Sequence, residues 1–394
     1  MTIEAVDTRA RGLRPRREAE AMGVAGSLRR LDWLLVAALG AVTAYGLWAT
    51  NGITMRDPGG SSLSRQALYA FAGAFVFVAV LAVDPDTYRR LRRPIYFGTL
   101  GIMVLVLAAG AATRGSKRWI DVGVFTFQPS EFGKVLFVLA LAGFVAERRH
   151  SISSPLTPLA IIGYAIFPIL LVFVQPDFGT ALVYLAALGA VLFVAGVRWS
   201  QLAVLAIVAV IAALGILWFL PAAGFNVLKP YQAQRLTGFT HPENDPRGAT
   251  YNVRQSIIAV GAGGLRGRGV SGATQTGLDY LPEHSTDFAF ASLAEEHGFM
   301  GTSILLLLYL LIVWRALKIV AGARDLYCAV VAGGIAFMFM FQVFVNSAMA
   351  MGAAPITGIP LPFVSVGGSS LITNFLAIGV LQAIHMRRPI RRRA

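Results

Sequence analysis

The chain has 394 residues, of which 56 % are hydrophobic and 14 % are charged, with a formal net charge of +14. A soluble domain of this length needs a larger charged surface, so the composition excludes an ordinary water-soluble fold. The hydrophobic residues come in blocks of roughly twenty, the length that spans the hydrocarbon core of a bilayer. The sequence therefore predicts an all-α polytopic membrane protein.

Ten membrane-spanning helices are expected. Their ranges are 31–50, 66–84, 94–112, 131–147, 157–175, 179–197, 200–220, 299–320, 326–348 and 369–386. The ranges 131–147 and 179–197 are short enough to be tilted or partly re-entrant. Residues 1–28, rich in Arg, Ala and Glu, are expected to form a disordered basic arm. Residues 29–388 form the membrane domain, and 389–394 a basic tail.

Arginine and lysine gather on one side of this ten-span arrangement. They lie before the first span, after the second, fourth, sixth and eighth spans, and at the C-terminus, as at Arg29, Arg89, Arg148, Arg315 and Arg391. The positive-inside rule therefore places both termini in the cytoplasm. Attraction of these segments to anionic lipid accounts for the positive charge without nucleic acid as a partner.

A polar stretch at about 221–287 separates the seventh and eighth spans and is expected to be extracellular. Connections of this length are usually functional or disordered. Residues 252–260 within it resemble a short amphipathic helix. The glycine-rich run 261–272 matches a dinucleotide-binding spacing, but no strand precedes it, so the nucleotide interpretation fails. Close approach of the backbone to a bulky or phosphorylated ligand is the favoured role for these glycines.

The outer loop at 113–130 carries Lys117, Arg118 and Trp119 on the side that should be poor in positive charge. Arg235 and Arg254 add cations in the long loop, which is exempt from the charge rule. Contact with lipid headgroups is one explanation. We favour an anionic ligand, because compact clusters of cations bind phosphate.

Charged residues also lie within or beside the spans. Glu131 and Lys134 are three residues apart, so they share a helix face and can pair. Ser130 is suited to cap that helix, and Asp177 to cap the sixth span. A charge at the centre of the bilayer costs about 2.5–3.5 kcal/mol even on a lenient scale. Two roles remain open for the pair: an ion pair that fixes helix orientation, or direct contact with substrate.

Two further segments on the expected outer side suggest a catalytic or binding site. Asp287 stands where the polar loop meets the eighth apolar block, and a carboxylate that loses water there becomes a more effective base. The alternative is that Asp287 only caps the following helix. Residues 355–370 are rich in proline and glycine, and such irregular backbone is tolerated only where protein or a water-filled cavity satisfies it.

Four separated signatures resemble the SEDS family of bacterial cell-wall polymerases (shape, elongation, division and sporulation proteins). In chain order they are Lys117–Trp119 with Gln128–Lys134, Gln175–Thr180, Leu281–Phe288, and Gly358–Ser370. The long-loop residues Asp245–Ala249 and Gly272–Gln275 resemble the RodA branch, which serves elongation, more than the FtsW branch, which serves division. Val366 departs from the family, which usually has tyrosine there.

The resemblance implies a peptidoglycan glycosyltransferase that polymerises lipid II at the outer face of the bacterial cytoplasmic membrane during elongation. Asp287 would be the base in an inverting displacement of undecaprenyl diphosphate. The implied substrate-binding residues are Lys117, Arg118, Trp119, Glu131, Lys134, Asp177, Thr180, Arg235, Arg254, Glu283, Ser365, Gly367, Gly368 and Ser369. The implied partner is a class B penicillin-binding protein, a transpeptidase. No metal motif is evident, and a divalent cation such as Mg²⁺ or Mn²⁺ is left open.

A flippase that carries lipid II across the membrane is the main alternative, since charged residues among helices suit an amphipathic cargo. The long outer loop with Asp287 argues against it, as does the lack of the internal repeat that is typical of alternating access. A non-catalytic scaffold is a third possibility, but it would not need cations and a carboxylate on one face.

Overall fold

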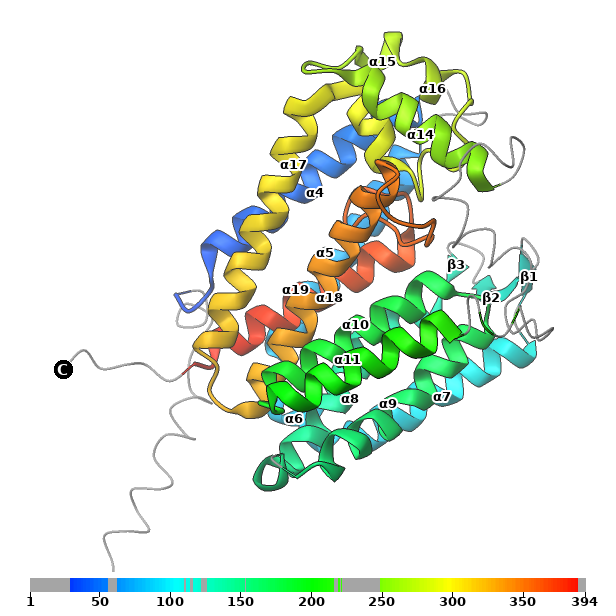
Figure 1. Ribbon diagram of the computed structural model, residues 1–394. Helices are drawn as coiled ribbons and strands as arrows, with labels where there is room; N and C mark the ends of the chain where they lie inside the picture. Colours follow the sequence, from blue (N-terminus) through cyan, green and yellow to red (C-terminus); the bar gives the residue numbers. More distant parts are fainter. Residues whose placement is uncertain are drawn as a thin grey trace, which may run out of the picture.

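The computed structural model describes residues 29–55, 62–109, 111–113, 116–121, 126–152, 154–215, 219, 221 and 249–388. The predicted arm at 1–28, the tail at 389–394 and most of the first half of the long loop lie outside these residues. The described part is a bundle of long helices with a cap of shorter ones at one end (Figure 1).

Each of the ten expected spans corresponds to one helix. They are α4 (Trp33–Ile53), α5 (Leu63–Ala82), α7 (Arg92–Ala109), α8 (Pro129–Glu147), α9 (Leu156–Val174), α10 (Phe178–Val194), α11 (Trp199–Leu214), α17 (Ala289–Ala321), α18 (Leu326–Ala350) and α19 (Gly368–Met386). Among the described residues, seven of these helices are long and apolar enough to cross a membrane by themselves, and α10 and α11 are shorter apolar helices. The prediction of a helical, polytopic membrane protein is therefore confirmed.

The shorter elements lie between the spans. They are α6 (Pro85–Arg90), the 3₁₀ turn η1 (Arg149–Ser151), α14 (Ala249–Gly263), α15 (Gly269–Gly272) and α16 (Thr274–Gly277). The helix expected at 252–260 is α14. One feature departs from an all-α fold: β1 (Ala111–Thr113), β2 (Ser116–Asp121) and β3 (Thr126–Phe127) form a small antiparallel sheet in that order.

Helices α8, α18 and α19 form the centre of the bundle and are buried along most of their length. Small residues allow this close packing: a Cβ on Gly334 of α18 would come within 2.7 Å of Val138 on α8. Helices α5 and α11 instead expose large apolar side chains, among them Phe71, Phe75 and Ile211. Such side chains are suited to contact lipid rather than water.

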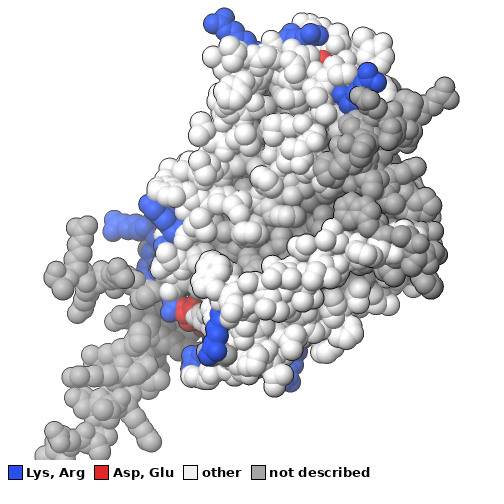
Figure 2. Space-filling model, viewed as in Figure 1, with Lys and Arg blue, Asp and Glu red and all other residues white. Residues whose placement is uncertain are grey.

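On the face that Figure 2 shows, the charged side chains of the described residues gather at the two ends of the molecule, with an uncharged band between them. At the end opposite the cap, ion pairs tie the helices together: Arg315 to Asp32 at 2.6 Å, Arg324 to Asp86 at 2.7 Å, and Arg387 to Asp84 at 3.5 Å. The other end carries α14 to α16 and the start of α17 (Figure 1). This polarity matches a chain that crosses a bilayer.

Helix α17 is broken near its N-terminal end at Gly298, where φ is 65° and ψ is −163°. The amides of Phe299 and Met300 donate to the carbonyls of Gly264 (2.8 Å) and Leu265 (3.1 Å), which replace partners inside the helix. The glycine-rich run therefore packs its backbone against α17. Gly263 and Gly267 make their close contact with the protein's own helix α17, and a close contact of the run with a ligand stays a prediction.

Replacing Gly298 with alanine is expected to lower the free energy of unfolding by about 2–4 kcal/mol. The new Cβ would overlap the backbone of Gly267, and an alanine is strained at this positive φ. Thermal unfolding of the purified protein in detergent measures the effect. Gly40→Ala is the control, because its Cβ would meet nothing within 4 Å, and an equal melting temperature for both variants would contradict the role of the break.

Candidate active site

The irregular segment 356–367 enters the helical bundle and is held there by side chains from four helices. Buried Thr50 of α4 donates to the carbonyl of Val364 (3.1 Å), and Gln66 of α5 donates to that of Ser365 (3.1 Å). Tyr309 of α17 donates to the carbonyl of Pro362 (2.5 Å), and Asn346 of α18 to that of Ile359 (2.7 Å). Of the two alternatives expected for this irregular backbone, protein or a water-filled cavity, these bonds show protein as the partner.

The same segment touches the loop that contains Asp287. The hydroxyl of Ser365 donates to the carbonyl of Thr286 (2.5 Å), and the amide of Val366 donates to that of Ser285 (2.9 Å). Asp287 itself is partly buried, one residue before Phe288, the cap of α17. Phe363 adopts a positive φ of 66°, an outlier for an aromatic residue and the kind of strain that collects at functional sites.

A second polar cluster is centred on Asp177. Its Oδ2 accepts hydrogen bonds from Gln128 (2.7 Å) and Ser130 (3.0 Å), and its Oδ1 caps α10 through the amide of Thr180 (3.4 Å). The guanidinium of Arg118 lies 3.7 Å from Oδ1. Asp177 thus caps α10 as predicted, while Ser130 does not cap α8: the cap residue is Gln128, and the Ser130 hydroxyl turns to Asp177.

Glu131 and Lys134 form a buried ion pair inside the bundle. The Lys134 ammonium contacts both carboxylate oxygens of Glu131, at 2.9 and 2.8 Å, and donates to Gln342 of α18 at 3.0 Å. All three side chains are almost inaccessible to solvent. Burial at this level is tolerated because every charge has a partner.

The start of α19 joins these parts. Ser369 accepts from the amide of Gln128 (3.0 Å) and donates to the carbonyl of Thr126 (2.9 Å), which ties it to β3 and α8. Gly367 donates to Gln66 (3.4 Å), and a side chain at Gly368 would meet the ring of Tyr69. Direct contacts therefore connect all four sequence signatures, although they are spread over most of the chain.

Similar proteins identify the fold. The family model of the cell cycle proteins FtsW, RodA and SpoVE matches residues 27–389. The chain belongs to this family. Relatives include the peptidoglycan glycosyltransferase MrdB of Escherichia coli K12, 38 % identical over 355 residues (90 % of this chain, 92 % of MrdB). Stage V sporulation protein E of Bacillus subtilis is 37 % identical over 354 residues (88 % and 93 %).

Solved structures agree. A chain from a peptidoglycan synthase complex, in a study of how polymerization and crosslinking are coordinated, is 30 % identical with a TM-score of 0.76, covering 90 % of this chain and 97 % of that one. RodA of Thermus thermophilus is 27 % identical with a TM-score of 0.66, covering 91 % and 97 %. The resemblance to the SEDS family inferred from the four signatures is thus confirmed.

The remaining residues implied by this resemblance lie as follows. Trp119 is partly buried on β2, Arg254 is exposed on α14, and Glu283 accepts a hydrogen bond from the Thr286 hydroxyl at 2.9 Å. The side chain of Lys117 and the whole of Arg235 lie outside the described part of the chain. Within the described ranges, no group of three or more His, Cys, Asp and Glu residues could hold a metal ion.

Sequence reasoning missed three buried amides: Gln66 of α5, and Gln342 and Asn346 of α18. Each holds another signature in place through hydrogen bonds. A signal was present, because a polar amide inside an apolar span is rare and usually has a partner there. In α18 the two amides are four residues apart and so share one face of the helix.

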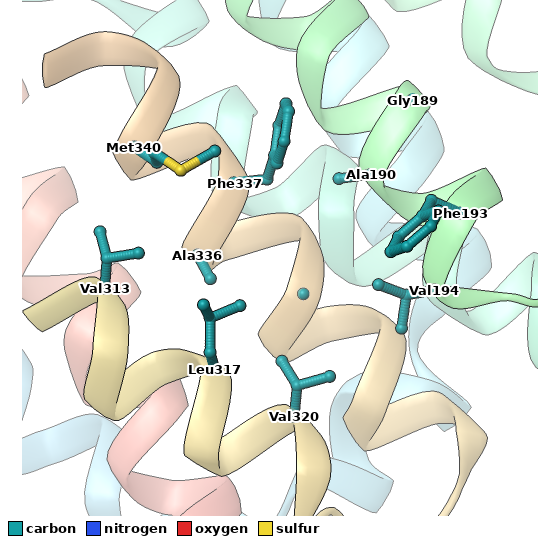
Figure 3. A pocket seen from close by; sticks show the side chains of 11 residues that line it. Gly189, Ala190, Phe193, Val194, Val313, Leu317, Val320, Ala336, Phe337 and Met340 are labelled. Carbon is teal, nitrogen blue, oxygen red and sulfur yellow. The ribbon is translucent and has the colours of Figure 1, made fainter. Parts of the chain in front are cut away.

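A cavity of about 420 Å³ lies elsewhere, between α10, α17 and α18 (Figure 3). Its lining is entirely apolar and includes Phe193, Leu317, Phe337 and Met340. Phe193 and Leu317 lie near the C-terminal ends of α10 and α17, whereas Asp287 precedes the N-terminus of α17. This cavity suits a hydrocarbon chain, and its lining offers no hydrogen-bonding partner to a charged group or a sugar. It is therefore not the candidate active site.

The buried pair gives a test of stability. Lys134→Met alone is expected to lower the free energy of unfolding by about 3–5 kcal/mol, because it leaves the Glu131 carboxylate buried and without its cation. The double variant Glu131→Gln with Lys134→Met removes both charges and is expected to recover most of the loss. Thermal unfolding in detergent measures both, and a double variant no more stable than the single one would refute the ion-pair explanation.

Proposed function

We propose that the chain is a peptidoglycan glycosyltransferase that polymerises lipid II, with Asp287 as the base. The observation that carries the proposal is the convergence of all four SEDS signatures, which joins the Asp287 loop to the segment 356–367 and that segment to the Asp177 cluster. The similar proteins include the peptidoglycan glycosyltransferase MrdB and the probable peptidoglycan glycosyltransferase FtsW of Idiomarina loihiensis, both 38 % identical to this chain.

In the proposed reaction, Asp287 accepts the proton of the acceptor sugar hydroxyl as its oxygen attacks the anomeric carbon of the donor. The new glycosidic bond forms as the bond from that carbon to the diphosphate oxygen breaks, with inversion. The lipid diphosphate leaves with the electron pair. Stabilising its charge requires cations, a role for Arg118 together with Lys117, Arg235 and Arg254.

Arg118 is suited to this role by its geometry. It is only partly exposed, its side-chain relative exposure being 28 %, and the nearby Asp177 oxygen lies at 3.7 Å rather than in a tight pair. Asp177 has three other hydrogen-bond donors, so the guanidinium can turn to a phosphate without leaving that carboxylate unpaired. A guanidinium also suits bidentate contact with phosphate oxygens.

The proposed orientation places Asp287 at the outer face and both termini in the cytoplasm. Its support is the gathering of arginines, among them Arg315, Arg324 and Arg387, at the opposite end of the bundle. A role in elongation is supported by the RodA-like loop residues Asp245–Ala249. A class B transpeptidase is the proposed partner, because a similar chain forms part of a synthase complex that couples polymerization to crosslinking.

The first test is Asp287→Asn. Loss of the base is expected to lower the rate of glycan polymerisation from labelled lipid II by about 10²–10⁴-fold while membrane insertion is retained. The assay is run on purified protein with and without a class B transpeptidase, and with Mg²⁺ or Mn²⁺ added or withheld. Asp279→Asn is the matched control, since this exposed carboxylate lies in the same loop.

Two outcomes contradict the proposal. If Asp287→Asn polymerises glycan at the wild-type rate, the assignment of Asp287 as the base is rejected. If the wild-type protein forms no glycan under any condition, yet moves lipid II across proteoliposome membranes, the flippase is the correct function.

The cation site is tested by binding. The double variant Lys117→Ala with Arg118→Ala is expected to raise the dissociation constant for labelled lipid II at least tenfold, because a hydrogen bond to a charged group contributes about 1.5–3 kcal/mol. Arg149→Ala, an exposed arginine at the other end of the bundle, serves as the control. Equal affinity of the double variant and the control would exclude these two residues from the diphosphate site.

A further inference from the structure

Asn346 lies inside α18, where its side chain is completely inaccessible to solvent. Its one amide nitrogen makes two hydrogen bonds, to the backbone carbonyl of Asp287 at 2.8 Å and to that of Ile359 at 2.7 Å. An amide carries two N–H groups on this nitrogen, so both donors are used. The side chain therefore connects a central helix, the Asp287 loop and the segment 356–367 at a single point.

Three successive backbone carbonyls of the loop before α17, those of residues 285–287, accept hydrogen bonds from other segments. Ser285 accepts from the Val366 amide, Thr286 from the Ser365 hydroxyl, and Asp287 from Asn346. The first two donors belong to the irregular segment 356–367, which itself depends on side chains of α4, α5 and α17 for support. Asn346 is the donor that belongs to a regular helix, and sites built on helices are held more accurately than sites built on loops.

We propose that Asn346 is a positioning residue for Asp287: it fixes the backbone from which the carboxylate extends and so sets where that carboxylate meets the acceptor hydroxyl. The inference rests on the proposed function, which assigns Asp287 as the base. Small errors in the placement of a catalytic group are costly, since a misplacement of about 1 Å can lower a rate about 100-fold. Asn346 itself makes no contact with substrate in this scheme.

The chemistry of the residue explains why an amide is required. A leucine of similar size fills the space but donates nothing, and leaves the buried carbonyl of Ile359 and the partly buried carbonyl of Asp287 without this donor. An aspartate has the same shape, yet its ionised form only accepts hydrogen bonds and would direct an oxygen at two carbonyl oxygens. Both variants should therefore release the Asp287 backbone by different physical routes.

The test compares Asn346→Leu and Asn346→Asp with Ser347→Ala in the polymerisation assay, with rates normalised to the folded fraction. Ser347 is the adjacent residue, and its hydroxyl donates to the carbonyls of Val343 (2.8 Å) and Phe344 (3.1 Å) of its own helix. For both Asn346 variants we expect kcat to fall about 10–100-fold while KM for lipid II changes less than twofold. Ser347→Ala is expected to retain the wild-type kcat.

A further comparison separates positioning from general stability. If Asn346 acts through Asp287, then adding Asn346→Asp to Asp287→Asn causes no further loss of rate, because the two residues act as a unit. A full additional loss would overturn the proposal, as would a raised KM with unchanged kcat. If one Asn346 variant does not fold, the other is measured alone.

Failure of this inference can be distinguished from failure of the proposed function. If Asp287→Asn is inactive while both Asn346 variants keep the wild-type kcat, the positioning role is rejected and the assignment of Asp287 as the base is retained. An active Asp287→Asn would reject the base itself, whatever Asn346 does.

Discussion

Backbone that leaves helical geometry inside a membrane bundle has to find hydrogen-bond donors from the protein around it, because each unsatisfied group costs several kcal/mol. Residues 356–367 impose this requirement. Four helices meet it with one side chain each, Thr50, Gln66, Tyr309 and Asn346. The arrangement of α4, α5, α17 and α18 around the segment follows from that need, and the Asp287 loop is held by the same network.

The charged groups obey a related rule. Lys134 sits between Glu131 and the oxygen of Gln342, and Asp177 is surrounded by four donors, of which Arg118 is the most distant. The buried Glu131 and Lys134 are thus tightly paired, whereas Arg118, which is partly exposed, is only loosely held by Asp177. This difference supports the proposed role of Arg118 in binding an anionic substrate, while the Glu131–Lys134 pair stabilises the bundle.

Features that depend on neighbours in sequence were predictable, and features that depend on distant contacts were not. The ten spans, α14, the Glu131–Lys134 pair and the Asp177 cap follow from hydrophobic length, helical spacing and capping chemistry. The break at Gly298 was missed, and the eighth span was expected to begin just after it, because the partners of the broken helix lie more than thirty residues earlier. The small sheet and the role of Asn346 likewise require knowledge of which segments meet.

The bonds between the first two spans and the irregular segment also have a consequence for biogenesis. Thr50 and Val364 are 314 residues apart in the chain, and Gln66 and Ser365 are 299 apart. Helices α4 and α5 enter the membrane early in synthesis, but their polar side chains have no designated partner until nearly the whole chain has left the ribosome. The site is therefore completed last, so a nascent or prematurely terminated chain would be inserted in the membrane and still unable to act on substrate.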